Sequence, residues 1–295
     1  MASMASSGMN VPSPSIAVIG CGSLGTAIVR GLMNEQKAKV RPSKICAAVS
    51  SQSSANTLHD TFEDSPIEVL VYQGGNTNAA RDCDVSILAC PPHSMSNVLG
   101  EKGMPDALKG KILISVLAGV QTSSILKTIY PAGVPSDDER CWVFRALPNL
   151  AVSTGASATA VEVPASETPA AKIGLVDLIM QQLGGIVHVP ALLMDAGTVL
   201  CGSAPAWVAL FVDGLVDGAV AAGVPRTKAN TMAAQMFAST AALLKEDQRP
   251  SALRESICAM PGCTTQGNLI LEEGGVRGVS AKAMKTAIEA ASGLG

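Results

Sequence analysis

A glycine-rich turn between an apolar strand and an amphipathic helix constrains the fold of this chain most strongly. The apolar run at residues 16–19 is followed directly by Gly20, Gly22 and Gly25, in the spacing G-x-G-x-x-G. Gly20 allows the tight turn, Gly22 leaves room for a pyrophosphate against the backbone, and Gly25 lets the helix pack closely on the strand. The free N–H groups and the dipole at the helix start favour a bound diphosphate. The motif therefore predicts a dinucleotide-binding site of the Rossmann type.

Short apolar runs alternate with helical patterns through the first half of the chain, which is typical of parallel strands joined by crossover helices. In the helix after the first strand, apolar residues recur on one face, and the small Gly31 is expected to let this helix lie close to the sheet. We predict an α/β domain over residues 16–190, after a flexible N-terminus at residues 1–15. The expected strands are residues 16–19, 45–49, 69–72, 85–89, 112–116, 142–147, 158–163 and 186–189, with a helix at about 167–182 before the last.

From residue 191 onward the pattern is helical only, with Ala-rich segments separated by glycine and proline. Between residues 206 and 222, small and apolar side chains run almost all the way round the expected helix, interrupted by Asp213 and Asp217. A helix without a polar face is usually buried. A domain of roughly 100 residues with few aromatics cannot bury such a helix alone, so a second copy of the chain is expected to cover it. We predict an all-α dimerisation domain over residues 191–295.

The charge balance and the aromatic content exclude several classes of partner. Lys and Arg number 21 against 24 Asp and Glu, a net charge of −3, which gives no general attraction to nucleic acid or anionic lipid. Aromatic residues make up 3% of the chain, so stacking platforms for bases are scarce. The longest apolar run near the middle, residues 204–212, is too short to span a bilayer and is followed by Asp213. We expect neither a nucleic acid nor a membrane as partner.

The 8 cysteines are scattered, without a C-x-x-C pair or a histidine at a metal-ligand spacing, so no metal site is predicted. They are expected to be reduced thiols, most of them small core residues. Asp213 and Asp217 lie one helical turn apart but lack a third ligand, so a solvated patch is expected there, and Arg226 is expected at a helix start or an intersubunit contact. The first residues carry neither a basic secretory segment nor the arginines of a mitochondrial presequence, so a cytoplasmic protein is expected.

The residues after the second strand bear on the choice of dinucleotide. An NAD-selective site would usually place a carboxylate there, but this chain has Ser50, Ser51 and Gln52. A 2′-phosphate would be repelled by an acid and can accept hydrogen bonds from these side chains. The sequence therefore favours NADPH, and use of NADH stays open because no arginine stands beside the serines.

The fourth and fifth strands end at residues 89–93 and 115–120, beside the topological switch point where nicotinamide is expected. His93 follows a proline pair, and we interpret it as a cap or loop residue rather than a catalytic acid. A Ser-His-Asp hydrolase is disfavoured because the sequence has no G-x-S-x-G turn.

Several further segments, in their order along the chain, resemble the pyrroline-5-carboxylate reductase family, and the resemblance extends from residue 16 to about residue 291. The motifs that carry it are residues 20–25 (GCGSLG), 89–93 (ACPPH), 145–149 (RALPN), 202–207 (GSAPAW), 217–226 (DGAVAAGVPR), 261–265 (PGCTT) and 271–275 (LEEGG).

The resemblance implies a Rossmann domain that binds NAD(P)H and a helical domain that interlocks with a second subunit, with dimers often assembling into a decamer. It implies reduction of a cyclic imine carboxylate, 1-pyrroline-5-carboxylate, to L-proline. A protonated imine is already electrophilic, so the protein needs mainly to hold it against the cofactor. Beside the glycines and the Ser50 cluster, the resemblance and the strand ends give these cofactor residues: Ser23, Leu24, Asn76, Ala89, Cys90, Pro91 and Ala118.

The resemblance also places the substrate carboxylate at a turn that begins a C-terminal helix, where N–H groups and hydroxyls form an anion site. Thr265 is the candidate catalytic residue, which anchors or polarises the substrate. The candidate substrate-binding residues are Asn149, Met260, Gly262, Cys263, Thr264 and Thr265.

Departures from the family pattern cluster around this expected cleft. Met260 stands where serine is usual, Cys263 where the second glycine of a pair is usual, and Pro91 where lysine is common; residues 150–151 replace a Thr-Pro pair. Loss of one hydrogen bond to a charged group, worth about 1.5–3 kcal/mol, weakens binding by about 10- to 150-fold. These departures leave open a related substrate, an alkylated pyrroline or a piperideine carboxylate, or a dinucleotide sensor without catalysis. The β-hydroxyacid dehydrogenases share the plan, but no lysine occurs between Lys172 and Lys228 to match their catalytic lysine.

Overall fold

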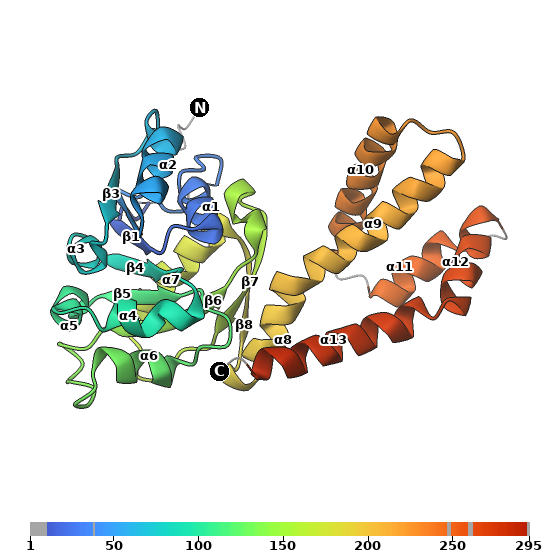
Figure 1. Cartoon of the computed structure of the whole chain (residues 1–295). Helices are drawn as coiled ribbons and strands as arrows, with labels where there is room; N and C mark the ends of the chain where they lie inside the picture. The colour runs from blue at the N-terminus through green and yellow to red at the C-terminus, as the bar shows by residue number, and fades with distance from the viewer. Residues whose placement is uncertain (1–10, 38, 247–248, 259–261, 294–295) are drawn as a thin grey trace, which may run out of the picture. The chain divides into compact units, whose positions relative to one another are not determined.

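The computed structural model describes residues 11–37, 39–246, 249–258 and 262–293, which divide into two compact units (Figure 1). The first unit holds the described residues up to Gly202 together with those from Ile288 onward. The second unit is Ser203–Ala287. The division therefore follows Gly202 rather than residue 190, and the end of the last helix returns to the first unit.

An eight-stranded sheet forms the centre of the first unit, in the order β3-β2-β1-β4-β5-β6-β7-β8. All neighbouring strands are parallel except the pair β6 and β7. The predicted α/β class is confirmed, and the apolar runs correspond to strands. Their bounds are β1 (Ile16–Ile19), β2 (Ile45–Val49), β3 (Val69–Gln73), β4 (Val85–Leu88), β5 (Ile112–Ser115), β6 (Trp142–Leu147), β7 (Ser157–Glu162) and β8 (Gly184–Val189).

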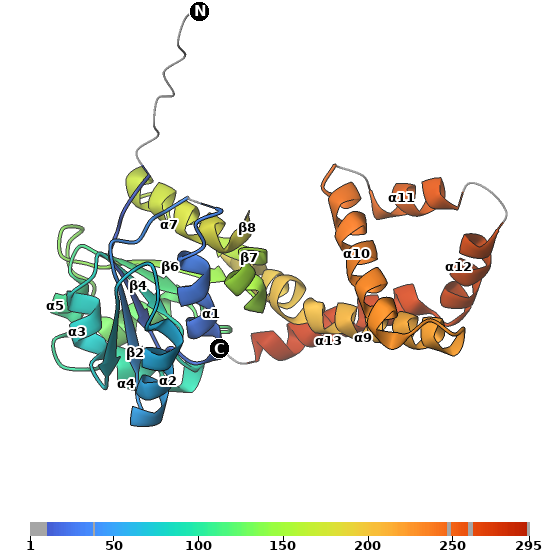
Figure 2. The ribbon, with the colours of Figure 1, turned by 90° about the horizontal axis from the view of Figure 1, so that it is seen from above.

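Helices cover both faces of this sheet (Figure 2). One face carries α1 (Ser23–Leu32), α2 (Gln52–Phe62) and α7 (Ala170–Leu183), whose apolar side chains join the larger core cluster. The other face carries the shorter helices α3 (Asn76–Arg81), α4 (Met95–Leu99), α5 (Met104–Leu108) and α6 (Thr122–Ile129).

Gly31 of α1 lies closest to a short 3-10 helix, η2 (Leu150–Thr154), and not to the sheet as predicted. A Cβ on Gly31 would lie 2.1 Å from the carbonyl oxygen of Val152, so a larger residue would push α1 and η2 apart. The sequence pattern indicated a close contact but not its partner, because η2 is far from α1 in sequence.

The second unit is all-helical, as predicted. A small buried cluster of Val216, Ala229 and Ala233 joins α9 to α10. Much of the apolar surface of α9 is exposed in the single chain, including Leu210, which is 74% exposed. The helices of this part of the chain are α9 (Ala204–Ala221), α10 (Arg226–Leu244), α11 (Pro250–Ile257), α12 (Cys263–Glu273) and α13 (Val276–Ser292).

A continuous helical stretch, Ala191–Ala221, precedes and includes α9. It is 31 residues long with a mean hydropathy of 1.7 over its most apolar window, enough to cross a membrane by length and composition alone, and 11% of that window is buried. This stretch is longer than the apolar run at residues 204–212 that the sequence analysis considered. The apolar run judged from sequence began at residue 204, whereas α8 (Met194–Thr198) and a π-turn (Val199–Ser203) extend the helix on its N-terminal side.

Candidate active site

The turn after β1 has a geometry that requires glycine at two positions. Gly20 has φ +91°, and a Cβ there would lie 2.5 Å from the backbone nitrogen of Cys90. A Cβ on Gly25 would lie 2.7 Å from the carbonyl oxygen of Gly20. In front of Gly22, by contrast, no described atom lies within 4 Å of a Cβ position, so the space is open. The backbone is therefore exposed to a ligand where the motif places a pyrophosphate.

Helix α1 begins directly behind this turn and presents its amide groups to the open space. No described side chain caps its N-terminus. The hydrogen bond from the N–H of Thr26 to the carbonyl of Gly22 is the first to close a helical turn. The N–H groups of Ser23 and Leu24 precede it and, with the helix dipole, form a favourable position for a phosphate.

A cleft of about 460 Å³ lies at this position, where the carboxyl ends of β1, β2, β4 and β5 meet. No carboxylate or cationic side chain is among the described residues that line it. Of the predicted cofactor residues, those lining the cleft are Gly20, Gly22, Ser23, Leu24, Ser50, Ala89, Cys90, Pro91 and Ala118.

The serine cluster after β2 divides between two roles. Ser50 lines the cleft, and so does Ser54, which the sequence analysis did not single out. Ser51 is the N-cap of α2, and its Oγ accepts a hydrogen bond from the N–H of Ser54 at 3.2 Å. The Gln52 side chain donates to Asn56 at 2.8 Å, on the exposed side of α2. The capping distance of three residues from Ser51 was the signal that could have identified Ser54.

Asn76 lies at the start of α3, outside the set of residues that line the cleft. Its Nδ2 donates to Oε1 of Glu101 at 2.6 Å, while the N–H and hydroxyl of Thr77 donate to Oε2 at 3.1 and 2.9 Å. One carboxylate thus fixes the start of α3. Because the Nδ2 of Asn76 donates to this carboxylate, its Oδ1 is the side-chain atom that can accept a hydrogen bond from a ligand. Glu101 is distant in sequence, and no local pattern indicated it.

Asn149 is held by backbone groups on both sides. Its Oδ1 accepts from the N–H of Ala151 at 3.0 Å, and its Nδ2 donates to the carbonyl of Cys201 at 2.8 Å. The side chain thereby caps η2 and joins it to the segment before α9. Its predicted role toward substrate stays a prediction.

The turn before α12 lies in the second unit. Gly262 is the N-cap with extended backbone, and no described side chain caps the helix. Cys263 and Thr264 are exposed, and Thr265 is half-buried. The amides of Cys263 and Thr264 precede the hydrogen bond from Gln266 to the carbonyl of Gly262. Met260 lies outside the described residues.

Acid and base groups are scarce in the dinucleotide cleft. Burial raises the pKa of the Cys90 thiol to about 11 and that of Cys21 to about 12, so both are neutral at physiological pH. His93 lies in a short 3-10 helix (Pro92–Ser94) and is not among the residues that line the cleft. The cleft is therefore suited to binding a phosphate-bearing ligand without nucleophilic or proton-transfer groups of its own.

The described part of the chain contains no cluster of side chains suited to a metal ion. Asp217 instead forms an ion pair with Arg226 at 2.7 Å, on exposed side chains of the second unit. This pair joins the end of α9 to the start of α10.

Two family models match the chain. "Pyrroline-5-carboxylate reductase dimerisation" matches residues 192–294, and "NADP oxidoreductase coenzyme F420-dependent" matches residues 15–119. The first covers the helical C-terminal part of the chain. The second covers the glycine turn and the strand ends that form the cleft.

The similarity to known proteins covers the full chain. A pyrroline-5-carboxylate reductase of Lophium arboricola is 38% identical, covering 100% of this chain and 97% of its own. The pyrroline-5-carboxylate reductase of Neurospora crassa is 34% identical, over 95% of this chain and 92% of its own length. A solved structure of a pyrroline-5-carboxylate reductase from Coxiella burnetii has a TM-score of 0.78 at 26% identity, covering 96% and 98%. The chain therefore belongs to the pyrroline-5-carboxylate reductase family.

Proposed function

We propose that this chain is an oxidoreductase that reduces 1-pyrroline-5-carboxylate to L-proline with NADPH. The observation that carries the proposal is the similarity to relatives of that name over both units, at 38% identity across the whole chain. The glycine turn after β1 and the turn before α12 both fall within it.

The dinucleotide cleft fits NADPH. The amides of Ser23 and Leu24 would hold the pyrophosphate, and the hydroxyls of Ser50 and Ser54 can donate to a 2′-phosphate. The lack of a carboxylate among the described lining residues favours the phosphorylated dinucleotide. A Plasmodium falciparum pyrroline carboxylate reductase of the same fold has been solved with NADP bound. When bound, NADPH supplies the hydride.

The substrate carboxylate is proposed to bind at the start of α12. The amides of Cys263 and Thr264 and the hydroxyl of Thr265 would hold it, because a helix N-terminus favours an anion. A protonated cyclic imine is already electrophilic at its imine carbon. The chain therefore needs mainly to bind and orient it and to exclude water. Thr265 is the candidate catalytic residue in this proposal, and no side chain is assigned as a general acid.

The dimerisation description of the matched family model supports an oligomer formed through the C-terminal helices. A partner subunit would cover the apolar stretch Ala191–Ala221 that the single chain leaves exposed. We infer further assembly of dimers into a decamer, and a cytoplasmic protein without a membrane or nucleic-acid partner. The 8 cysteines, all free, suit a reducing compartment.

Steady-state oxidation of NADPH and NADH against a panel of cyclic imines tests this function. The panel comprises 1-pyrroline-5-carboxylate, an alkylated pyrroline carboxylate and a piperideine carboxylate. The largest kcat/KM is expected for 1-pyrroline-5-carboxylate with NADPH. A larger value for another ring would assign the chain to that substrate, in keeping with the thiol of Cys263 at the start of α12. Cofactor binding without turnover of any imine would indicate a sensor and overturn the proposal.

A further inference from the structure

A second cavity of about 460 Å³ lies in the first unit, beside the loop after β5. Gly119 and the start of α6 form one side of it, and Arg145, Glu162 and Asp195 contribute charged side chains. It shares no lining residue with the dinucleotide cleft. Residues 116–118 line that cleft, so consecutive residues of one loop face the two spaces.

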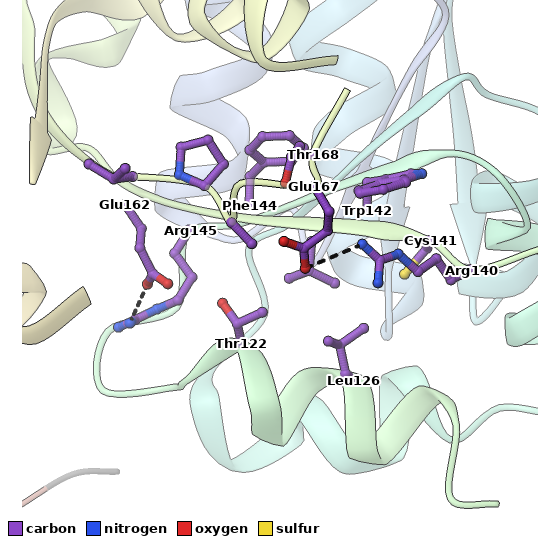
Figure 3. Close-up of a pocket in the computed structure, with 14 residues that line it drawn as sticks. Thr122, Leu126, Arg140, Cys141, Trp142, Phe144, Arg145, Glu162, Glu167 and Thr168 are labelled. Atoms are coloured by element: carbon purple, nitrogen blue, oxygen red, sulfur yellow. Dashed lines mark hydrogen bonds and ion pairs between the residues drawn. The ribbon is translucent and has the colours of Figure 1, made fainter. Parts of the chain in front are cut away.

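Arg145 is the most unusual group in this cavity. Its side chain is 6% exposed, and its Nη1 donates to Oε2 of Glu162 at 2.8 Å. Its Nε is buried and finds no acceptor among the described residues. Figure 3, a close-up of an adjoining pocket, shows the Arg145 guanidinium beside Glu162. Both residues, with Thr122 of α6, also line the cavity described here. One of the five donors of this buried guanidinium, the Nε–H, therefore has no acceptor among the described residues.

The start of α6 adds a second source of positive potential. Gln121 is the N-cap, and no described side chain caps the helix. The N–H groups of Ser124 and Ile125 bond to the carbonyl of Gln121, so those of Thr122 and Ser123 precede the first helical turn. A carboxylate between these amides and Arg145 would receive donors from both.

Negative groups line the same cavity. Glu162 is largely buried against Arg145, and Asp195 of α8 accepts a hydrogen bond from the Ser292 hydroxyl at 3.0 Å. Asp195 forms no ion pair with a basic side chain of the described residues. A ligand with only a negative charge would be repelled by Glu162 and Asp195. A ligand with only a positive charge would be repelled by Arg145. A ligand that carries both charges satisfies all of them.

We propose that this cavity binds a small α-amino acid as its zwitterion. The carboxylate lies against Arg145 and the first amides of α6, and the ammonium group lies against Asp195. The site is distinct from the proposed substrate turn, which lies in the second unit.

Isothermal titration of the NADP⁺-saturated full chain with L-alanine tests the proposal, with acetate and ethylamine as probes that carry one charge each. L-Alanine is expected to bind at least tenfold more tightly than either probe. Asp195→Asn is expected to weaken L-alanine at least tenfold while leaving acetate within twofold. The variant keeps an acceptor for Ser292, and an unchanged NADP⁺ affinity in it verifies folding.

Thr265→Ala is the matched control, because it alters the proposed substrate turn and not this cavity. Its affinity for L-alanine is expected to stay within twofold of the unaltered chain. Loss of L-alanine binding in Thr265→Ala, with retention in Asp195→Asn, would place the amino acid at the substrate turn and overturn the proposal. Equal affinity for acetate and L-alanine would also overturn it. Neither result bears on whether the chain reduces an imine.

Discussion

A Cβ placed on Gly20 would lie 2.5 Å from the backbone nitrogen of Cys90, so the turn after β1 is packed against the end of β4. This contact fixes the position of the glycine turn relative to the strand ends that line the cleft. The left-handed φ of +91° at Gly20 is a second reason why only glycine fits. Two independent constraints therefore act on one residue.

Gly20→Ala is expected to lower the free energy of unfolding by about 1–3 kcal/mol and to weaken NADPH binding strongly, because the turn must move away from Cys90. Urea unfolding and calorimetric NADPH titration check this. The control is Gly74→Ala, which has φ +64° but no described atom within 4 Å of its Cβ position. It should cost stability yet keep NADPH affinity within about twofold, since strain without a clash is confined to its own loop. NADPH binding by Gly20→Ala equal to that of the unaltered chain would refute the role of the contact.

Thr265→Ala is expected to reduce kcat/KM for 1-pyrroline-5-carboxylate by about 10- to 150-fold. The reason is loss of a hydroxyl hydrogen bond to a charged carboxylate, worth about 1.5–3 kcal/mol. Thr265→Ser keeps the hydroxyl and should retain most of the activity. Steady-state kinetics at varied substrate check both variants. Unchanged kinetics in Thr265→Ala would remove this residue from the site.

Ser50→Asp is expected to lower the ratio of kcat/KM for NADPH to kcat/KM for NADH by about tenfold or more. A tenfold change is equivalent to about 1.4 kcal/mol. The new carboxylate repels a 2′-phosphate and accepts hydrogen bonds from a 2′-hydroxyl. Thr61→Asp is the control, because it adds the same charge at a half-buried residue of α2 outside the cleft. The ratio of kcat/KM values for the two cofactors is the measurement. A preference that shifts equally in both variants would mean that Ser50 does not contact the 2′ position.

Leu210→Glu is expected to dissociate the oligomer, because this α9 side chain is 74% exposed in the single chain and needs a partner to cover it. Sedimentation velocity at micromolar concentration gives the result. Ser96→Glu, on α4 of the first unit, introduces the same charge at an exposed position and should leave the mass unchanged. A Leu210→Glu protein that sediments with the mass of the unaltered chain would show that this face lies outside the interface.

The decrease in the free energy of unfolding at acid pH should depend on Asp84. Its carboxylate accepts hydrogen bonds from the hydroxyl and the N–H of Ser15 at 2.7 and 2.9 Å, and the hydroxyl chiefly holds its pKa below the usual range. Since the folded-state pKa is the lower one, the stabilisation is present at neutral pH and is lost as pH falls below about 4 toward that value. Asp84→Asn should therefore give a shallower loss of stability in acid. Asp60→Asn, on the exposed side of α2, is the control, and an equally shallow curve there would contradict the assignment.

The sequence predicted the strands that build the cleft because each is a short apolar run bounded by turn residues. The strands β1 to β5 begin where predicted and end within one residue of the expected positions. The glycine spacing likewise identified the turn, since the steric demands at Gly20 and Gly25 are local to it.

What the sequence did not reveal depends on contacts between distant residues. Glu101 holds Asn76 across 25 positions, and α8 packs with the first unit although its pattern is purely helical. The charged cavity around Arg145 likewise combines residues from five separate segments of the chain. Hydrophobic periodicity reports the face that a helix buries but not the element that covers it.

The most direct test of the central claim follows the hydride itself. The purified chain is incubated with 1-pyrroline-5-carboxylate and NADPH deuterated at the transferring position, and the ring product is analysed by mass spectrometry and NMR. The account predicts L-proline that carries deuterium at the former imine carbon, formed in equal amount to the NADP⁺ released. Proline without deuterium, or bound NADPH that is never oxidised in the presence of the imine, would contradict it.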